Sequence, residues 1–137
     1  MVTKVTYIFL KKIKCNLIVF SIGALGYGLI EILWRGRTHW SMLTAGGISF
    51  WGLCRISTNL KRLPLVKKAF LGCGLITVIE YIYGIVFNKI LGKNVWNYSK
   101  MPLNLSGQIC ALYSFFWFIL SLLFIPLANK LHNILED

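Results

Sequence analysis

Two carboxylates lie inside long apolar stretches of this chain, and their position makes them the first candidates for chemistry. Glu31 and Glu80 are the single charged residues of the runs 16–34 and 69–88. A carboxylate in a membrane-spanning helix costs roughly 2.5–3.5 kcal/mol on insertion scales, so it is a candidate for function by default. We therefore take Glu31 and Glu80 as candidate intramembrane residues of a transport path.

The two glutamates differ in their sequence neighbours. Arg35 follows Glu31 by four residues, the spacing and order that favour an ion pair on one helix. This spacing predicts a structural salt bridge, with a functional role as the alternative. Glu80 has no cation three or four residues away, so Thr77, Tyr81 or a cation from the other half of the chain are its candidate partners. Without a partner, a buried Glu80 becomes a candidate proton carrier.

A second set of candidates lies in the segment 94–108, which mixes aromatic and amide side chains directly before the last apolar run. Trp and Tyr favour the membrane interface, so one interpretation is a loop anchored by its aromatic residues. The alternative is an external lid or re-entrant segment whose polar side chains face a cavity. The candidate residues are Trp96, Asn97, Tyr98, Ser99, Pro102, Asn104, Gly107 and Gln108.

Glu80 and this segment resemble the signature of a known family. The residues that carry the resemblance are Glu80, Trp96-Asn97-Tyr98-Ser99 and Pro102-Leu103-Asn104-Leu105-Ser106-Gly107-Gln108-Ile109-Cys110. They are similar to the putative ABC-transporter type IV, permease-like family of bacterial membrane proteins. In that family an intramembrane Glu precedes a tryptophan-aspartate-tyrosine-serine motif and a proline-phenylalanine-asparagine-leucine-asparagine-glycine run. The resemblance covers residues 76–122 and is looser at 26–37; Asn97 replaces the usual aspartate and Ser106 the usual asparagine.

The elements that must position these residues are predicted to be four transmembrane helices. Hydrophobic residues make up 57% of the chain and charged residues 14%, whereas soluble domains draw about a quarter from charged types. About 20 mostly apolar residues cross a bilayer as a helix, and backbone amides that must be paired in lipid disfavour strands. The predicted spans are 16–34, 38–54, 69–88 and 107–127; the run 38–54, rich in Gly and Ser, is the weakest.

The distribution of Lys and Arg predicts the orientation of these spans. Ten cations lie before the first span, between the second and third, and after the fourth, against five in the other two connections. The positive-inside rule therefore places both termini in the cytoplasm, for a multi-pass protein of the bacterial inner membrane. The basic segment 1–15 also contains apolar residues and could lie on the membrane as an interfacial helix.

An internal repeat predicts how the spans are arranged within a single membrane domain, residues 1–137. The stretches 28–34 and 77–83 each place one glutamate in the outer half of the first helix of a helical hairpin. The predicted fold is thus an all-α integral membrane bundle of two parallel hairpin repeats, with both glutamates directed inward. Stripes of small and polar residues favour close helix packing. They are Ser21, Ala24, Gly28 and Glu31 in one helix, and Cys73, Thr77, Glu80 and Gly84 in the other.

Three classes of function remain open from these features. The family resemblance implies a permease-like transport component; the alternatives are a non-transporting scaffold or accessory protein, with structurally paired glutamates, and an enzyme acting on lipid. Four short helices enclose little space, so a pathway would require a homo-oligomer or other membrane subunits in the bilayer. An enzyme would need clustered catalytic groups, and we expect none.

Composition and motifs argue against several partners. The net charge of +11 comes from cations that flank the apolar runs, which favours contact with anionic lipid over nucleic acid. The four cysteines and two histidines match no metal or redox spacing, so we expect no metal and no cofactor. The sequence lacks a Gly-x-x-x-x-Gly-Lys-Ser/Thr motif, so any ATP hydrolysis by a P-loop would have to come from a partner.

Overall fold

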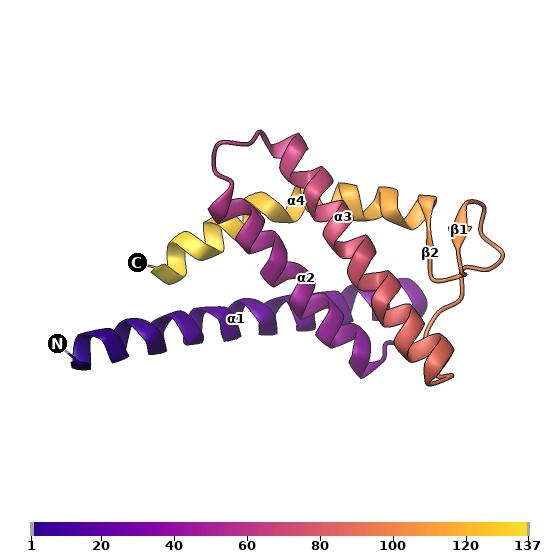
Figure 1. The fold of residues 1–137 in the computed structure, drawn as a ribbon, viewed down its shortest axis with the longest axis horizontal. Helices are drawn as coiled ribbons and strands as arrows, with labels where there is room; N and C mark the ends of the chain where they lie inside the picture. The colour runs from indigo at the N-terminus through magenta and orange to yellow at the C-terminus, as the bar shows by residue number, and fades with distance from the viewer. Residues whose placement is uncertain (1, 137) are drawn as a thin grey trace.

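The computed structural model describes residues 2–136, which form a bundle of four α-helices with a small hairpin at one end (Figure 1). Met1 and Asp137, the ends of the predicted domain, lie outside the described residues. The helices are α1 (Val2–Arg35), α2 (Trp40–Asn59), α3 (Leu65–Tyr83), continued by the π-helix η1 (Gly84–Ile90), and α4 (Ala111–Glu136). Strands β1 (Asn104–Leu105) and β2 (Ile109–Cys110) pair antiparallel. The predicted all-helical class is confirmed.

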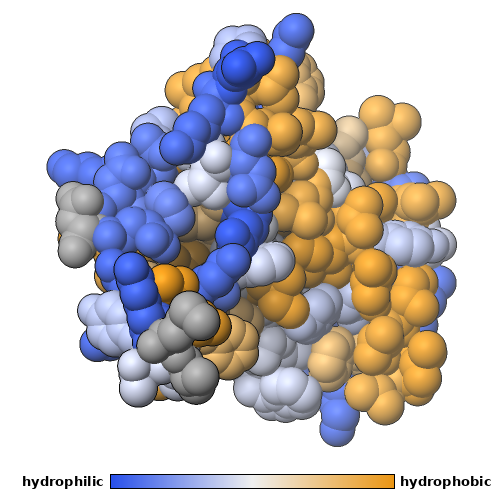
Figure 2. Space-filling view, turned by 60° about the vertical axis from the view of Figure 1, so that its left-hand side comes forward, coloured by the Kyte–Doolittle hydropathy of each residue, from blue (hydrophilic) through white to orange (hydrophobic). Residues whose placement is uncertain are grey.

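Three helices of the described chain are long and apolar enough to cross a membrane: Thr3–Arg35, Leu65–Ile90 and Ala111–Glu136. Their outward side chains suit a lipid environment, since Leu25, Leu33 and Leu123 are 72%, 78% and 64% exposed. Figure 2 shows apolar side chains covering one side of the visible face, while hydrophilic side chains gather along the other. The chain is therefore a helical membrane protein.

Helix α2 does not belong to that set, and its place in the bundle gives the physical reason. It packs against α1, α3 and α4, and half of its length is buried by them. A helix shielded by protein needs fewer apolar side chains than one that faces lipid. Close approach also requires small residues, because a Cβ on Gly46 would collide with Tyr27 of α1. The low hydropathy of α2 thus follows from its central position.

The boundaries of all four helices differ from the expected spans, including the start of α1 and both ends of α4. Helix α1 is continuous, so residues 2–15 of the basic segment extend the same helix as the apolar run 16–34. Helix α4 begins at Ala111 rather than at Gly107, because Ser106 and Gly107 adopt positive φ angles of 56° and 71° in the turn of the hairpin. At its other end α4 passes through Pro126 and continues to Glu136.

The α3–α4 interface uses the small and polar stripe of α3. Cys73 Sγ donates to the carbonyl of Ser114 at 3.0 Å, and Thr77 Oγ1 lies 3.1 Å from Ser114 Oγ. On α1 only the outer end of the corresponding stripe is buried, since Glu31 is enclosed whereas Ser21 is exposed. The stripes therefore turn both glutamates into the bundle, which is the arrangement their spacing predicted.

Candidate functional site

Glu80 lies on α3 in the interior of the bundle, with 5% of its surface exposed. The hydroxyl of Tyr98 donates to Oε2 at 3.2 Å, and the indole Nε1 of Trp117 donates to Oε1 at 3.4 Å. Within the described part of the chain no cation forms an ion pair with this carboxylate. Glu80 is thus held by neutral aromatic donors from the segment 94–108 and from α4, without a counter-charge.

Within the described chain the hydrogen bonds of Glu80 go to Tyr98 and Trp117, and to neither of the α3 partners that sequence spacing suggested. Thr77 contacts Ser114, and Tyr81 follows Glu80 by one residue, which turns it about 100° around an α-helix with 3.6 residues per turn. Trp117 was not among the predicted site residues. It comes from the last helix, and no local spacing links it to Glu80.

Glu31 is also buried, but it forms the ion pair predicted from its spacing. Arg35 Nε donates to Oε2 at 2.6 Å and Arg35 Nη2 donates to Oε1 at 3.2 Å. The third guanidinium nitrogen, Nη1, donates to the carbonyl of Val95 at 2.8 Å. Arg35 therefore neutralises Glu31 and ties the end of α1 to the outer segment.

The segment 94–108 folds as a cap over one end of the bundle, fastened by Asn88 of η1. Asn88 Oδ1 accepts from the backbone amide of Val95 at 2.6 Å, and its Nδ2 donates to Gln108 Oε1 at 2.8 Å. Trp96 Nε1 then donates to the carbonyl of Gln108 at 2.9 Å. Trp96 and Gln108 are both buried, so the cap is packed against the helices and is more than an interfacial anchor.

The other motif residues build the turns of this cap. Asn97 Oδ1 accepts from the amide of Ser99 at 2.9 Å, an acceptor role that an aspartate would fill equally well. Asn104 Oδ1 accepts from the amide of Gly107 at 3.0 Å, and its Nδ2 donates to the carbonyl of Met101 at 2.8 Å. Asn97, Ser99 and the nearby Pro102 are exposed, so these residues shape the cap and do not face the interior of the bundle.

Tyr98 is the residue through which the cap reaches the site. Its ring stacks on Tyr113 of α4, with centroids 4.7 Å apart, and its hydroxyl bonds Glu80. Burial raises the pKa of the Tyr98 phenol well above its ordinary value, with the charge of Glu80 as a second cause. Tyr98 therefore keeps its proton at neutral pH and acts as a hydrogen-bond donor to the carboxylate.

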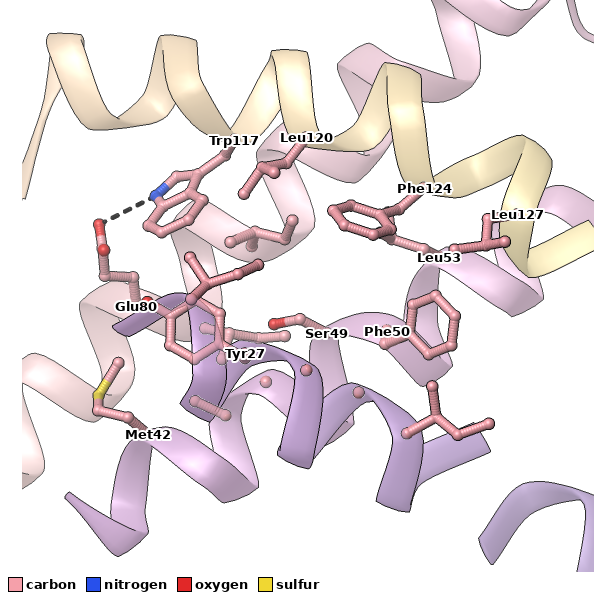
Figure 3. Close-up of a pocket in the computed structure, with 18 residues that line it drawn as sticks. Tyr27, Met42, Ser49, Phe50, Leu53, Glu80, Trp117, Leu120, Phe124 and Leu127 are labelled. Carbon is pink, nitrogen blue, oxygen red and sulfur yellow. Dashed lines mark hydrogen bonds between the residues drawn. The ribbon is translucent and has the colours of Figure 1, made fainter. Parts of the chain in front are cut away.

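Glu80 borders a groove that runs between α1 and α4 over a floor of α2 and α3. Helix α1 packs mainly on α2, and α4 on α3, so α1 and α4 hardly touch. The groove consists of two adjoining cavities of about 290 and 270 Å³, and Glu80, Tyr27 and Trp117 line both. Figure 3 shows Glu80 beside Trp117 at one end and apolar side chains such as Phe124 and Leu127 beyond them.

This arrangement can bind a ligand. One uncompensated carboxylate and several aromatic rings can hold a cation or pass a proton. Among the described residues no three His, Cys, Asp or Glu side chains gather to hold a metal ion. The candidate site is therefore Glu80 with its aromatic neighbours and the groove that reaches them.

Comparison with known proteins places the chain in a family. Neither the curated proteins nor the solved structures gave a match. One family model, described as Putative ABC-transporter type IV, matches residues 2–136. That match extends the resemblance noted at residues 76–122 over the length of the described fold, including α1 and α2. The chain belongs to the putative ABC-transporter type IV family.

Proposed function

We propose that this protein is a permease-like component of a transport system in the bacterial inner membrane, and that Glu80 is the polar group of its transport path. The supporting observation is that Glu80 is buried beside a groove without a cationic partner. A carboxylate that only fastened helices would be expected to pair with a cation, as Glu31 does with Arg35. Family membership supports the transport assignment.

The proposal includes four membrane crossings with both termini in the cytoplasm. Helix α2 has 20 residues and is about 30 Å long at 1.5 Å per residue, which equals the apolar thickness of a bilayer. As two parallel hairpin repeats, α1 pairs with α2 and α3 with α4, and each first helix contributes one glutamate to the groove. The segregation of Lys and Arg supports this orientation.

A single chain of this size is small for a complete pathway. The groove opens along the side of the bundle rather than through its centre, since it lies between α1 and α4. A second copy or another membrane subunit placed against this side would close the groove into a path. We therefore include a homo-oligomer or a complex with other membrane subunits in the proposal.

Flux through reconstituted protein tests the function. The purified protein is placed in phosphatidylcholine vesicles that contain a pH-sensitive dye, and gradients of protons or monovalent cations are imposed. The proposal predicts flux above that of empty vesicles, its loss in Glu80→Gln, and its retention in Glu136→Gln, which neutralises an exposed carboxylate. It fails if the wild type moves no ion or solute tested, or if Glu80→Gln keeps the wild-type rate.

A scaffold or accessory role is the second candidate, and the Arg35 contacts favour it. Arg35 joins Glu31 to the cap through three hydrogen bonds, an arrangement that stabilises a fold without moving anything. Under this alternative, Glu80→Gln lowers thermal stability or disrupts assembly, and the wild type shows no flux. The vesicle experiment, combined with thermal unfolding of the same variants, separates the two candidates.

A further inference from the structure

The groove opens to the surface between α1 and α4, except where Trp34 of α1 contacts Phe116 of α4 beside the cap. Several lining residues are themselves partly exposed: Ile22 by 44%, Ile30 by 37% and Leu127 by 50%. All three lie in helices that are long and apolar enough to cross a membrane. A molecule dissolved in the bilayer could therefore enter sideways between the two helices, without crossing the polar cap.

The charges of the groove leave one negative group to be matched. The cavity of about 270 Å³, which Trp96 and Tyr98 of the cap help to line, is called the outer cavity. Its charged lining residues are Glu31, Arg35 and Glu80, and the first two neutralise each other at 2.6 Å. The cavity of about 290 Å³, called the inner cavity, has Glu80 as its charged lining residue. An occupant of complementary charge carries one positive charge at the level of Glu80 and none along the rest of the groove.

Aromatic rings surround that position. Tyr27, Tyr98, Tyr113 and Trp117 all line the outer cavity together with Glu80. Tyr98 stacks on Tyr113, and the centroid of Tyr27 lies 6.0 Å from that of Trp117. The faces of Tyr and Trp rings attract ammonium groups, which is how aromatic cages bind them. A carboxylate among four such rings favours an ammonium over a metal ion or an anion.

The inner cavity has the shape and lining of a tail site. It extends from Glu80 and Trp117 towards Phe124 and Leu127 (Figure 3), and along α4 the rise from Trp117 to Leu127 is about 15 Å. Apart from Glu80 its lining is almost entirely apolar, so burial of a hydrocarbon chain there is favourable. The groove can therefore bind a charged head group at Glu80 and an apolar chain at its other end.

We infer that this groove binds a single-chain amphipathic monocation that enters from the bilayer, with its ammonium group against Glu80 and its apolar chain between α1 and α4. The inference rests on the proposed function, since it names the substrate class of the same site. Tyr98 and Trp117 hold the carboxylate in place, and the second lone pair of each oxygen accepts from the ammonium.

Binding of three probes with the same chain tests this inference. Dodecylammonium, dodecanol and dodecanoate are titrated into the purified protein in one non-ionic detergent, and bound copies are counted by native mass spectrometry. We expect dodecylammonium to bind at least about tenfold more tightly than dodecanol, as one ion pair with aromatic contacts supplies, and dodecanoate to bind most weakly. In Glu80→Gln the preference for the cation is lost, whereas Glu136→Gln retains it.

A groove-filling variant keeps the test independent of the carboxylate. A Cβ on Gly26 meets no atom within 4 Å and Gly26 lines the groove, so we expect Gly26→Leu to fill part of the groove without displacing its neighbours. Gly74 of α3 is equally open but lies outside both cavities, so Gly74→Leu is the matched control. We expect Gly26→Leu to reduce dodecylammonium binding at least tenfold and Gly74→Leu to leave it unchanged.

The outcomes separate this inference from the proposed function. Equal binding of dodecylammonium and dodecanol overturns the inference, since the groove then holds only a lipid tail. A cation preference that survives Glu80→Gln, or dodecylammonium binding that Gly26→Leu does not weaken, also overturns it. Tighter binding of dodecanoate overturns it as well. If the protein transports another solute but shows no preference for dodecylammonium, the proposed transport function stands and the inference about its substrate fails. If it prefers dodecylammonium but transports nothing, the binding site stands and the transport function fails.

Discussion

Removal of Arg35 gives the sharpest test of how the two glutamates differ. In Arg35→Gln the buried Glu31 loses both of its donated bonds, and the carbonyl of Val95 loses its bond to α1. Breaking a fully buried ion pair costs roughly 3–5 kcal/mol. Because 24% of the Arg35 side chain is exposed, we expect a loss of about 2–3 kcal/mol in the free energy of unfolding. Glu31→Gln should cost only about 1 kcal/mol, since the remaining cation can reach water.

The double variant completes the thermodynamic cycle. With both side chains changed to Gln, neither position 31 nor position 35 carries an unpaired charge, so the two losses should not add. We expect the double variant to be at least about 1 kcal/mol more stable than additivity predicts. Unfolding in mixed detergent and dodecyl sulfate, followed by tryptophan fluorescence, measures all four proteins. Strict additivity, or an Arg35→Gln variant no less stable than Glu31→Gln, would refute the reasoning.

Two further predictions concern the packing and the cap. Gly46→Ala places a methyl group against α1, whereas Gly74→Ala faces open space. We therefore expect the free energy of unfolding of Gly46→Ala to be lower than that of Gly74→Ala by about 1–3 kcal/mol. Equal values would show that α1 and α2 do not approach closely. Asn88→Ala removes three hydrogen bonds that fasten the cap, so trypsin should cleave at Lys100 several-fold faster than in the wild type. Asn97→Asp, which retains its acceptor, is the matched control and should be cleaved at the wild-type rate.

The residues that were predictable from sequence are those set by local spacing. The Glu31–Arg35 pair follows from one helical turn, and the inward direction of Glu80 follows from the stripe that begins at Cys73. Apolar length sufficed for α1, α3 and α4, because lipid-facing helices must be apolar on most of their surface. Local sequence patterns therefore predict these helices and the direction in which their polar residues point.

The contacts that make the site are long-range, and no spacing predicts them. Trp117 reaches Glu80 across 37 positions of the chain, and Asn88 fastens a cap that begins several residues later. The start of α4 at Ala111 depends on a positive φ at Gly107, which turn geometry sets and apolar periodicity cannot reveal. The groove itself arises from which helices do not pack, a property of the whole bundle.

Labelling with a hydrophobic carbodiimide tests the central claim, that Glu80 is an unpaired carboxyl group reached from the apolar groove. Dicyclohexylcarbodiimide dissolves in the bilayer and adds to a protonated carboxyl group, giving a stable N-acylurea that peptide mass spectrometry locates. We expect modification of Glu80, protection of the ion-paired Glu31, and loss of the Glu80 adduct in Gly26→Leu. Modification of Glu31 in preference to Glu80, or no modification of Glu80 in the wild type, would contradict it.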